Sequence, residues 1–285
     1  MFDGSPRDSR WVEARVDLAA IRHNVGVMRA LVAPAAVWAV VKADGYGHGA
    51  VPAARAVMAG GAEGLCVALA QEGVELRDAG IDAPILLLSE PPAAVAPAVV
   101  EHSLTPTVYT ESGIDAIGRA AQDAGVVVPV HLKVDTGMHR VGCARADAAP
   151  LARRIAEHPG LELEGVFTHL AVADEPDNAY TDEQLARFTA VLDALEAEGL
   201  LPPIVHAANS AATIVRADAR LDMVRVGITV YGIPPAGALA PVEGLVPALR
   251  LTSEVTYVKR VPAGARLSYG LRYRSEEHTS GLQSL

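Results

Sequence analysis

Eight short apolar segments alternate with longer segments of helical periodicity between residues 17 and 243, and this alternation restricts the folds that the chain can adopt. Such a pattern is typical of parallel strands that are joined by helices. Eight such repeats predict an α/β fold of the (β/α)8 TIM-barrel type, with a doubly wound open sheet as the alternative. The strand-like segments are residues 37–41, 65–69, 85–88, 105–110, 130–134, 165–169, 204–208 and 223–231.

Two of the intervening segments carry signals for the start of a helix. Asp17 is placed to cap a helix, and Thr181 and Gln184 fit a capping box that is followed by an apolar stripe with Gly199 as the stop. The apolar face of the first helix would hold Leu18, Ile21, Val25 and Met28. Both segments are therefore expected to be amphipathic helices that cover the strands.

The alternation stops near residue 244, which marks a domain boundary. We expect residues 17–243 to form the barrel and residues 244–273 to open a β-rich C-terminal domain that is incomplete, with residues 1–16 pairing with it. Residues 274–285 have no apolar period and are similar to the translated read-through of a sequencing adaptor. We interpret them as a non-native tail, with a genuine disordered tail as the alternative.

Composition excludes several classes of protein. Lys and Arg total 24 against 34 Asp and Glu, a net charge of −10, so nucleic acid is not an expected partner. The longest apolar run, residues 30–41, is too short to span a membrane, and the polar residues 1–10 do not form a signal peptide. Cys66 and Cys143 cannot build a disulfide framework, which indicates a cytoplasmic location. We expect no metal centre.

The segment 41–49, Val-Lys-Ala-Asp-Gly-Tyr-Gly-His-Gly, is the first candidate for chemistry. Lys42 lies where an apolar strand opens into a glycine-rich turn, and a partly desolvated lysine at such a place can form a Schiff base to an aldehyde cofactor. The glycines allow backbone N–H groups to approach a phosphate. Taken alone, the alternative for Lys42 is a surface lysine whose stem packs on apolar neighbours.

Further polar residues follow the other strands, at the end of a barrel where active sites form. Each alone has an ordinary explanation, such as a core histidine or an ion-paired arginine. Together they place an amine, several cations and phosphate-compatible loops on one rim. They are Lys133, Arg140, His169, His206, Asn209, Ser210, Arg225, Gly227 and Ile228.

On these motifs the chain resembles the alanine racemases, pyridoxal 5'-phosphate (PLP) enzymes that have a TIM barrel and a C-terminal β domain. The likeness covers about residues 11–274. It rests on the segments AVVKADGYGHG, KVDTGMHRVG, FTHLAVADE, HAANSAA, MVRVGITVYG and LSYG.

The resemblance implies roles for the site residues. Lys42 would carry the PLP Schiff base as one catalytic base, and Tyr269 would be the other, entering from the partner subunit of a homodimer. Arg140 would bind the substrate carboxylate, and Lys133 matches a lysine that the family often carries as a carbamate. The remaining contacts to the cofactor would come from Tyr46, His169, Asn209, Ser210, Arg225, Gly227 and Ile228.

These roles agree with the chemistry of racemisation. Removing a proton from one face of Cα and returning one to the other is most direct with two bases on opposite faces. A guanidinium at the pyridine nitrogen keeps its own proton, so Arg225 would leave the ring neutral and limit transamination.

The predicted function is PLP-dependent interconversion of L-alanine and D-alanine, which in this family supplies D-alanine for the bacterial cell wall. Because the C-terminal domain is expected to be incomplete, we expect this chain to have low activity or none. The alternatives are another amino-acid racemase of the same fold and a non-catalytic PLP-binding barrel.

Overall fold

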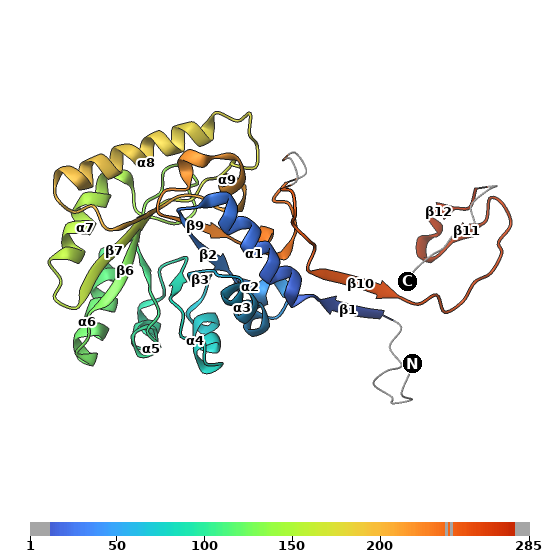
Figure 1. The fold of residues 1–285 in the computed structure, drawn as a ribbon, viewed down its shortest axis with the longest axis horizontal. Coiled ribbons are helices and arrows are strands. Elements are labelled where there is room, and N and C mark those ends of the chain that lie inside the picture. Colours follow the sequence, from blue (N-terminus) through green and yellow to red (C-terminus); the bar gives the residue numbers. More distant parts are fainter. Residues whose placement is uncertain (1–11, 237–238, 240–241, 277–285) are drawn as a thin grey trace. The chain divides into compact units, whose positions relative to one another are not determined.

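The computed structural model describes residues 12–236, 239 and 242–276, and the chain divides into two compact units. The larger unit is formed by residues 17–248 (Figure 1). The smaller unit combines the segment that ends at Val16 with the segment that begins at Leu249. Residues 1–11 and 277–285, which include most of the segments predicted to pair and to be non-native, lie outside the described residues.

Within the described residues, the larger unit contains eight parallel strands in two sheets, ordered β4-β3-β2-β9 and β5-β6-β7-β8. Hydrogen bonds join the sheets at both ends, from Thr105 N to Ile85 O (2.9 Å) and from Arg225 N to Ala208 O (3.0 Å). The strands therefore close into a ring, which confirms the predicted α/β barrel and excludes an open sheet. The strands are β2 (Ala36–Val40), β3 (Gly64–Val67), β4 (Ile85–Leu87), β5 (Thr107–Val108), β6 (Val128–Lys133), β7 (Leu161–Phe167), β8 (Ile204–His206) and β9 (Met223–Val226).

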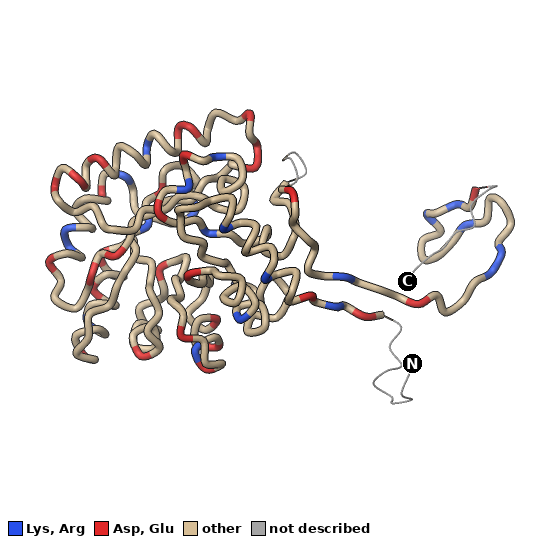
Figure 2. Tube along the Cα trace, in the orientation of Figure 1, with Lys and Arg blue, Asp and Glu red and all other residues tan. Residues whose placement is uncertain are grey.

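Helices lie outside the ring of strands, where their apolar faces cover it (Figure 1). Four short 3-10 helices in this unit add turns at η1 (Ala93–Val95), η2 (Arg145–Asp147), η3 (Ala217–Ala219) and η4 (Ile228–Tyr231), counted within the described residues. Figure 2 shows Lys and Arg residues interspersed with Asp and Glu residues along the outer helices of this unit. The α-helices are α1 (Leu18–Val32), α2 (Lys42–Gly47), α3 (Ala50–Ala59), α4 (Ala70–Asp78), α5 (Ala96–Glu101), α6 (Glu111–Ala124), α7 (Ala148–Ala156), α8 (Tyr180–Ala197) and α9 (Ser210–Val215).

The two predicted helix starts have different outcomes. Asp17 caps α1, because its carboxylate accepts hydrogen bonds from the first-turn N–H groups of Ala19 (2.9 Å) and Ala20 (3.1 Å). The capping box of Thr181 and Gln184 is wrong. Helix α8 begins earlier because the Asn178 side chain accepts from Tyr180 N (3.0 Å), which leaves Thr181 and Gln184 inside the first turns.

The last predicted strand, residues 223–231, is too long. Strand β9 ends at Val226, and the following residues form the 3-10 helix η4. The N–H of Gly227 donates to the Ser210 hydroxyl (2.9 Å) rather than to a neighbouring strand, so the ladder stops there.

The interior of the barrel combines an apolar cluster with buried polar side chains. The cluster includes Trp38, Leu86, Met223 and Cys66, whose thiol is fully buried. The polar side chains at 4 % exposure or less include His131, Lys133, His206 and Arg225. Aliphatic residues normally dominate such interiors, so these four side chains require an explanation.

The smaller unit consists of two antiparallel strand pairs. Strand β1 (Val12–Val16) pairs with β10 (Leu249–Ser253), and β11 (Arg266–Leu267) pairs with β12 (Tyr273–Arg274). The 3-10 helix η5 (Tyr269–Leu271) lies between the last two strands. Many of its apolar side chains are exposed, including Leu251, Tyr257 and Val258.

Among the helices that the structure describes, none has the length and apolar character that crossing a bilayer demands.

Candidate active site

A cavity of about 610 Å³ lies at the carboxyl ends of the barrel strands. Tyr269 belongs to the smaller unit, where it begins η5 and its side chain is fully exposed. His206, also predicted on this rim, is fully buried and does not line the cavity. The other predicted site residues line it, and these are Lys42, Tyr46, Lys133, Arg140, His169, Asn209, Ser210, Arg225, Gly227 and Ile228.

Lys42 is held at the cavity by an unusual turn. Strand β2 ends just before it, and the next four residues, 43–46, take left-handed helical angles with φ between 51° and 61°. The turn is closed by a hydrogen bond from Gly45 N to Val41 O (2.9 Å). Only one of these four residues is glycine, so neighbouring groups must hold the turn against its preference for the other hand.

Glu72 is one of the groups that hold this turn, and sequence reasoning missed it. One carboxylate oxygen accepts from Ala43 N (2.6 Å), and the other accepts from Ala68 N (2.8 Å) and Leu69 N (3.0 Å). A single carboxylate therefore ties the residue after Lys42 to the end of β3. A glutamate three residues after the N-cap residue Leu69, in the first turn of a helix, was the available signal.

The residues that the sequence predicts to hold a phosphate form a small cradle. The Ser210 hydroxyl accepts from Gly227 N (2.9 Å) and contacts the hydroxyl of Thr229 (3.3 Å). A Cβ at Gly227 would lie 2.5 Å from the hydroxyl oxygen of Tyr46, so only glycine leaves this space open. The Tyr46 ring packs on Tyr231 with its centroid 5.2 Å away.

Asn209 lines the cavity, but its amide bonds to the scaffold. The side-chain oxygen accepts from Ala212 N (3.0 Å) and so caps α9, while the nitrogen donates to Leu170 O (3.1 Å). The side chain therefore joins the loops after β7 and β8.

Arg225 forms the buried floor of the cavity. It donates to Thr168 O (2.9 Å), Ala207 O (3.0 Å) and His206 Nδ1 (2.6 Å), with a longer contact to His169 Nδ1 (3.3 Å). Burial lowers the pKa of Arg225 to about 10, so the guanidinium remains charged at neutral pH. A fixed cation with defined orientation results.

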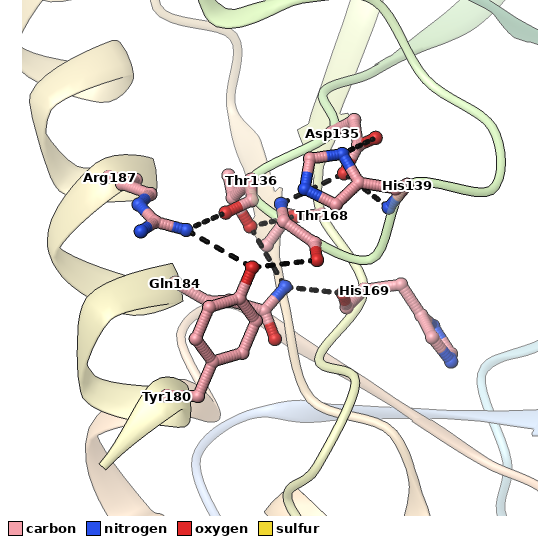
Figure 3. Close-up of polar contacts among 9 residues, drawn as sticks. Asp135, Thr136, His139, Thr168, His169, Tyr180, Gln184 and Arg187 are labelled. Carbon is pink, nitrogen blue, oxygen red and sulfur yellow. Dashed lines mark hydrogen bonds and ion pairs between the residues drawn. The ribbon is translucent and has the colours of Figure 1, made fainter.

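The loop that carries His169 is clamped by Gln184 from α8 (Figure 3). The Gln184 nitrogen donates to His169 O (3.1 Å) and Thr136 Oγ1 (3.3 Å), and its oxygen accepts from Ala171 N (2.8 Å). Burial, followed by the charge of Arg225, holds the pKa of His169 well below its ordinary value. His169 is therefore neutral at neutral pH.

Lys133 is a buried amine beside the same cavity. Its Nζ donates to Leu88 O (2.8 Å) and lies 5.1 Å from the centroid of the Phe167 ring. Burial, together with the charges of Arg225 and Arg140, lowers the pKa of Lys133 to about 7. A substantial fraction of this amine is therefore neutral at neutral pH.

The loop after β6 brings Arg140 to the cavity. Asp135 shapes this loop, because its carboxylate accepts from Gly137 N (2.8 Å) and His139 N (3.1 Å) (Figure 3). The His139 ring is exposed and forms an ion pair with Asp135 (3.5 Å), so it points to no chemical role.

The cavity is strongly cationic. Among the described residues that line it, the basic side chains are Lys42, Arg140, Arg225 and the partly neutral Lys133, against the single carboxylate of Asp174. Such a set attracts an anion, and a fixed guanidinium is suited to a carboxylate or a phosphate.

Comparison with known proteins agrees with this geometry. Residues 16–235 match the family model described as the alanine racemase N-terminal domain. The chain belongs to the alanine racemase family. It is 43 % identical over 272 residues to an alanine racemase of Desulfovibrio desulfuricans and 46 % identical over 277 residues to one of Thermobifida fusca. In both cases the match covers 95 % of this chain and 73 % of the relative.

Solved alanine racemases share the fold. The enzyme from the D-cycloserine producer Streptomyces lavendulae superposes with a TM-score of 0.87 at 38 % identity, over 94 % of this chain and 71 % of that one. The enzyme from E. faecalis superposes with a TM-score of 0.85 at 42 % identity, over 94 % of this chain and 72 % of that one.

Proposed function

We propose that this chain interconverts L-alanine and D-alanine at the cavity, with PLP held on Lys42. The observation that carries the proposal is the convergence of the Lys42 amine, two arginines, the Lys133 amine and the Ser210–Gly227 cradle on one cavity, in a chain of the alanine racemase family.

The residues present fit PLP. The cradle beside Gly227, which a Cβ would close, suits a phosphate together with the Tyr46 hydroxyl and the backbone of Ile228. The cationic lining suits both that phosphate and a substrate carboxylate. When bound, PLP supplies the electron-withdrawing system that stabilises negative charge at the substrate Cα.

The chain's own groups would then position the substrate and move the proton. Arg140 binds the carboxylate of alanine, and Arg225 donates a hydrogen bond toward the pyridine nitrogen without giving up its proton. The Lys42 amine removes or returns the Cα proton on one face. The hydroxyl of Tyr269 does so on the other face, entering from the partner subunit.

Lys133 is proposed to carry a carbamate. A neutral amine is required to attack CO2, and a pKa of about 7 makes that form available near neutral pH. The neutral amine nitrogen bonds to the carbon of CO2 and releases one proton, which turns a neutral group into an anion beside Arg140; the ammonium form must first lose a proton of its own. A ¹³C signal from labelled bicarbonate, absent in Lys133→Met, tests this assignment.

Three broader assignments are proposals as well. We propose a homodimer, a cytoplasmic location, and a β-rich second domain to which residues 244–273 belong. The antiparallel strand pairs of the smaller unit support the last point.

Absorbance and racemisation together test the proposed function. PLP added to the purified chain should give a violet-edge absorption band that Lys42→Ala abolishes, and borohydride reduction should leave the cofactor permanently attached to Lys42. Racemisation should then be measured with alanine, serine and lysine. Attachment of the reduced cofactor to another residue would contradict the site, and faster turnover of serine or lysine would contradict the substrate.

A further inference from the structure

A column of hydrogen-bonded side chains runs from the cavity floor through the interior of the barrel. Arg225 Nη1 contacts His206 Nδ1 (2.6 Å), His206 Nε2 contacts His131 Nδ1 (2.8 Å), and His131 Nε2 contacts Glu164 Oε2 (3.1 Å). The side chain of His131 is fully buried, whereas that of Glu164 is 33 % exposed. The column therefore connects a buried cation to a carboxylate that reaches solvent.

The groups at the two ends of the column determine which nitrogen of each histidine ring carries the proton. A guanidinium can only donate, so His206 Nδ1 is an acceptor and the proton of the neutral ring lies on Nε2. That N–H donates to Nδ1 of His131, whose own proton then lies on Nε2 and donates to the Glu164 carboxylate. Burial and the charge of Arg225 hold the pKa of His206 well below its ordinary value, which keeps this ring neutral.

Two local departures from regular strand geometry build the lower end of the column. Strand β7 has a bulge at Glu164, because Leu163 pairs with Val130 and Gly165 pairs with His131. The extra residue is how a strand redirects a side chain. At the next position, a Cβ on Gly165 would lie 2.5 Å from Cε1 of His131, so the absence of a side chain makes room for the imidazole.

The column links the buried positive charge of Arg225 to a negative charge. The other acceptors that the described residues offer Arg225 are neutral, namely Thr168 O, Ala207 O and His169 Nδ1. Burying a cation without a compensating negative charge lowers the stability of the folded chain. Polar side chains also occupy positions that aliphatic residues fill in most barrel interiors. Glu164 provides that charge at the far end of the column.

We propose that Glu164 is a positioning residue for Arg225, acting through His131 and His206. Its carboxylate accepts the last N–H of the column and so stabilises, from the opposite end, the same tautomers that Arg225 requires; His206 then presents an acceptor to the guanidinium and holds it toward the cavity. The importance of this orientation for racemisation rests on the proposed function, whereas the tautomers themselves do not.

Imidazole ¹⁵N NMR on the cofactor-free full chain tests the column directly. In the unmodified chain, His131 and His206 should both be Nε2–H tautomers. Glu164→Leu removes the acceptor and should produce a mixture of tautomers at His131. Glu164→Gln retains an acceptor oxygen and should restore the Nε2–H form, while Glu162→Gln, an exposed position on the same strand, should leave both rings unchanged.

Kinetics provide the second measurement. We expect Glu164→Leu to lower kcat about tenfold with little change in KM for alanine, and Glu164→Gln to recover part of the loss, in the range known for residues that orient a functional group. Nδ1–H tautomers in the unmodified chain, or an unchanged His131 in Glu164→Leu, would overturn the proposal. Absence of the PLP band with the expected tautomers would instead overturn the proposed function and leave the column intact.

Discussion

The two units of this chain differ in how they are supported. The barrel unit closes its strand ladder, buries its apolar side chains and satisfies its cavity residues with carboxylates and amides such as Glu72 and Gln184. In the smaller unit, the strands form two separate pairs and Tyr257 and Tyr269 are exposed. Isolated two-stranded pairs are marginally stable. The proposed cofactor site thus lies in a self-supporting unit, whereas the proposed second base lies in a unit whose described residues form no core of their own.

Because of this difference, we predict that some variants lose turnover but keep cofactor binding. Lys42→Ala should abolish both cofactor binding and turnover. Removal of the amine deletes the covalent attachment and one base, so racemisation should fall by about 10³-fold or more. Absorption spectra and a racemisation assay measure the two effects, with thermal unfolding as the control for folding. Retention of the covalent band would contradict the assignment of Lys42.

Tyr269→Phe should affect turnover alone. Loss of the hydroxyl should lower kcat about 10²-fold, and kcat more in one direction than in the other with KM changing in proportion, while the PLP band stays the same. Tyr257→Phe is the matched control, since it removes a hydroxyl from another exposed tyrosine of the same unit. If Tyr269→Phe also removed the band, the separation between the two units would be wrong.

Gly165→Ala should destabilise the barrel unit by about 3 kcal/mol, because the new Cβ would overlap the ring of a fully buried histidine. Chemical denaturation with urea measures the change in the free energy of unfolding. Gly26→Ala is the control, because nothing lies within 4 Å of its added Cβ and alanine is the better helix former. An unchanged free energy of unfolding in Gly165→Ala would show that the barrel interior has room for a Cβ at position 165.

Lys133 should make stability depend on pH. Its pKa is about 7 in the folded chain against 10.5 for the ordinary side chain, so between these values the unfolded chain binds one more proton. The free energy of unfolding should therefore rise with pH, by about 2 kcal/mol between pH 7 and 9 in CO2-free buffer. Lys133→Met should lose this rise. An identical slope in both chains would place the titrating group elsewhere.

Much of the site could be predicted because strand ends are readable from local patterns. Lys42, Arg225 and Gly227 each follow an apolar run, and parallel strands bring such positions together at one end of a barrel. Gln184 illustrates what could not be predicted. Its spacing from Thr181 matched a local cap, but its partners lie on loops around residues 136 and 169–171, and no local pattern contains those contacts.

The polar column was missed for a similar reason. His131 and Glu164 are 33 positions apart and meet only because a bulge and a glycine occur at adjacent positions of β7. A residue inserted into a ladder changes which face a side chain takes, and periodicity assumes that no such residue exists.

The left-handed turn after Lys42 offers a route to a more heat-resistant protein. Ala43 has a φ of 51°, which disfavours an L-residue by about 1 kcal/mol and does not disfavour glycine. Ala43→Gly should therefore raise the melting temperature modestly and leave the PLP band unchanged, since this side chain is exposed and does not line the cavity. The mirror-image amino acid at this position, introduced by chemical synthesis, would combine that relief with a smaller entropy of the unfolded chain.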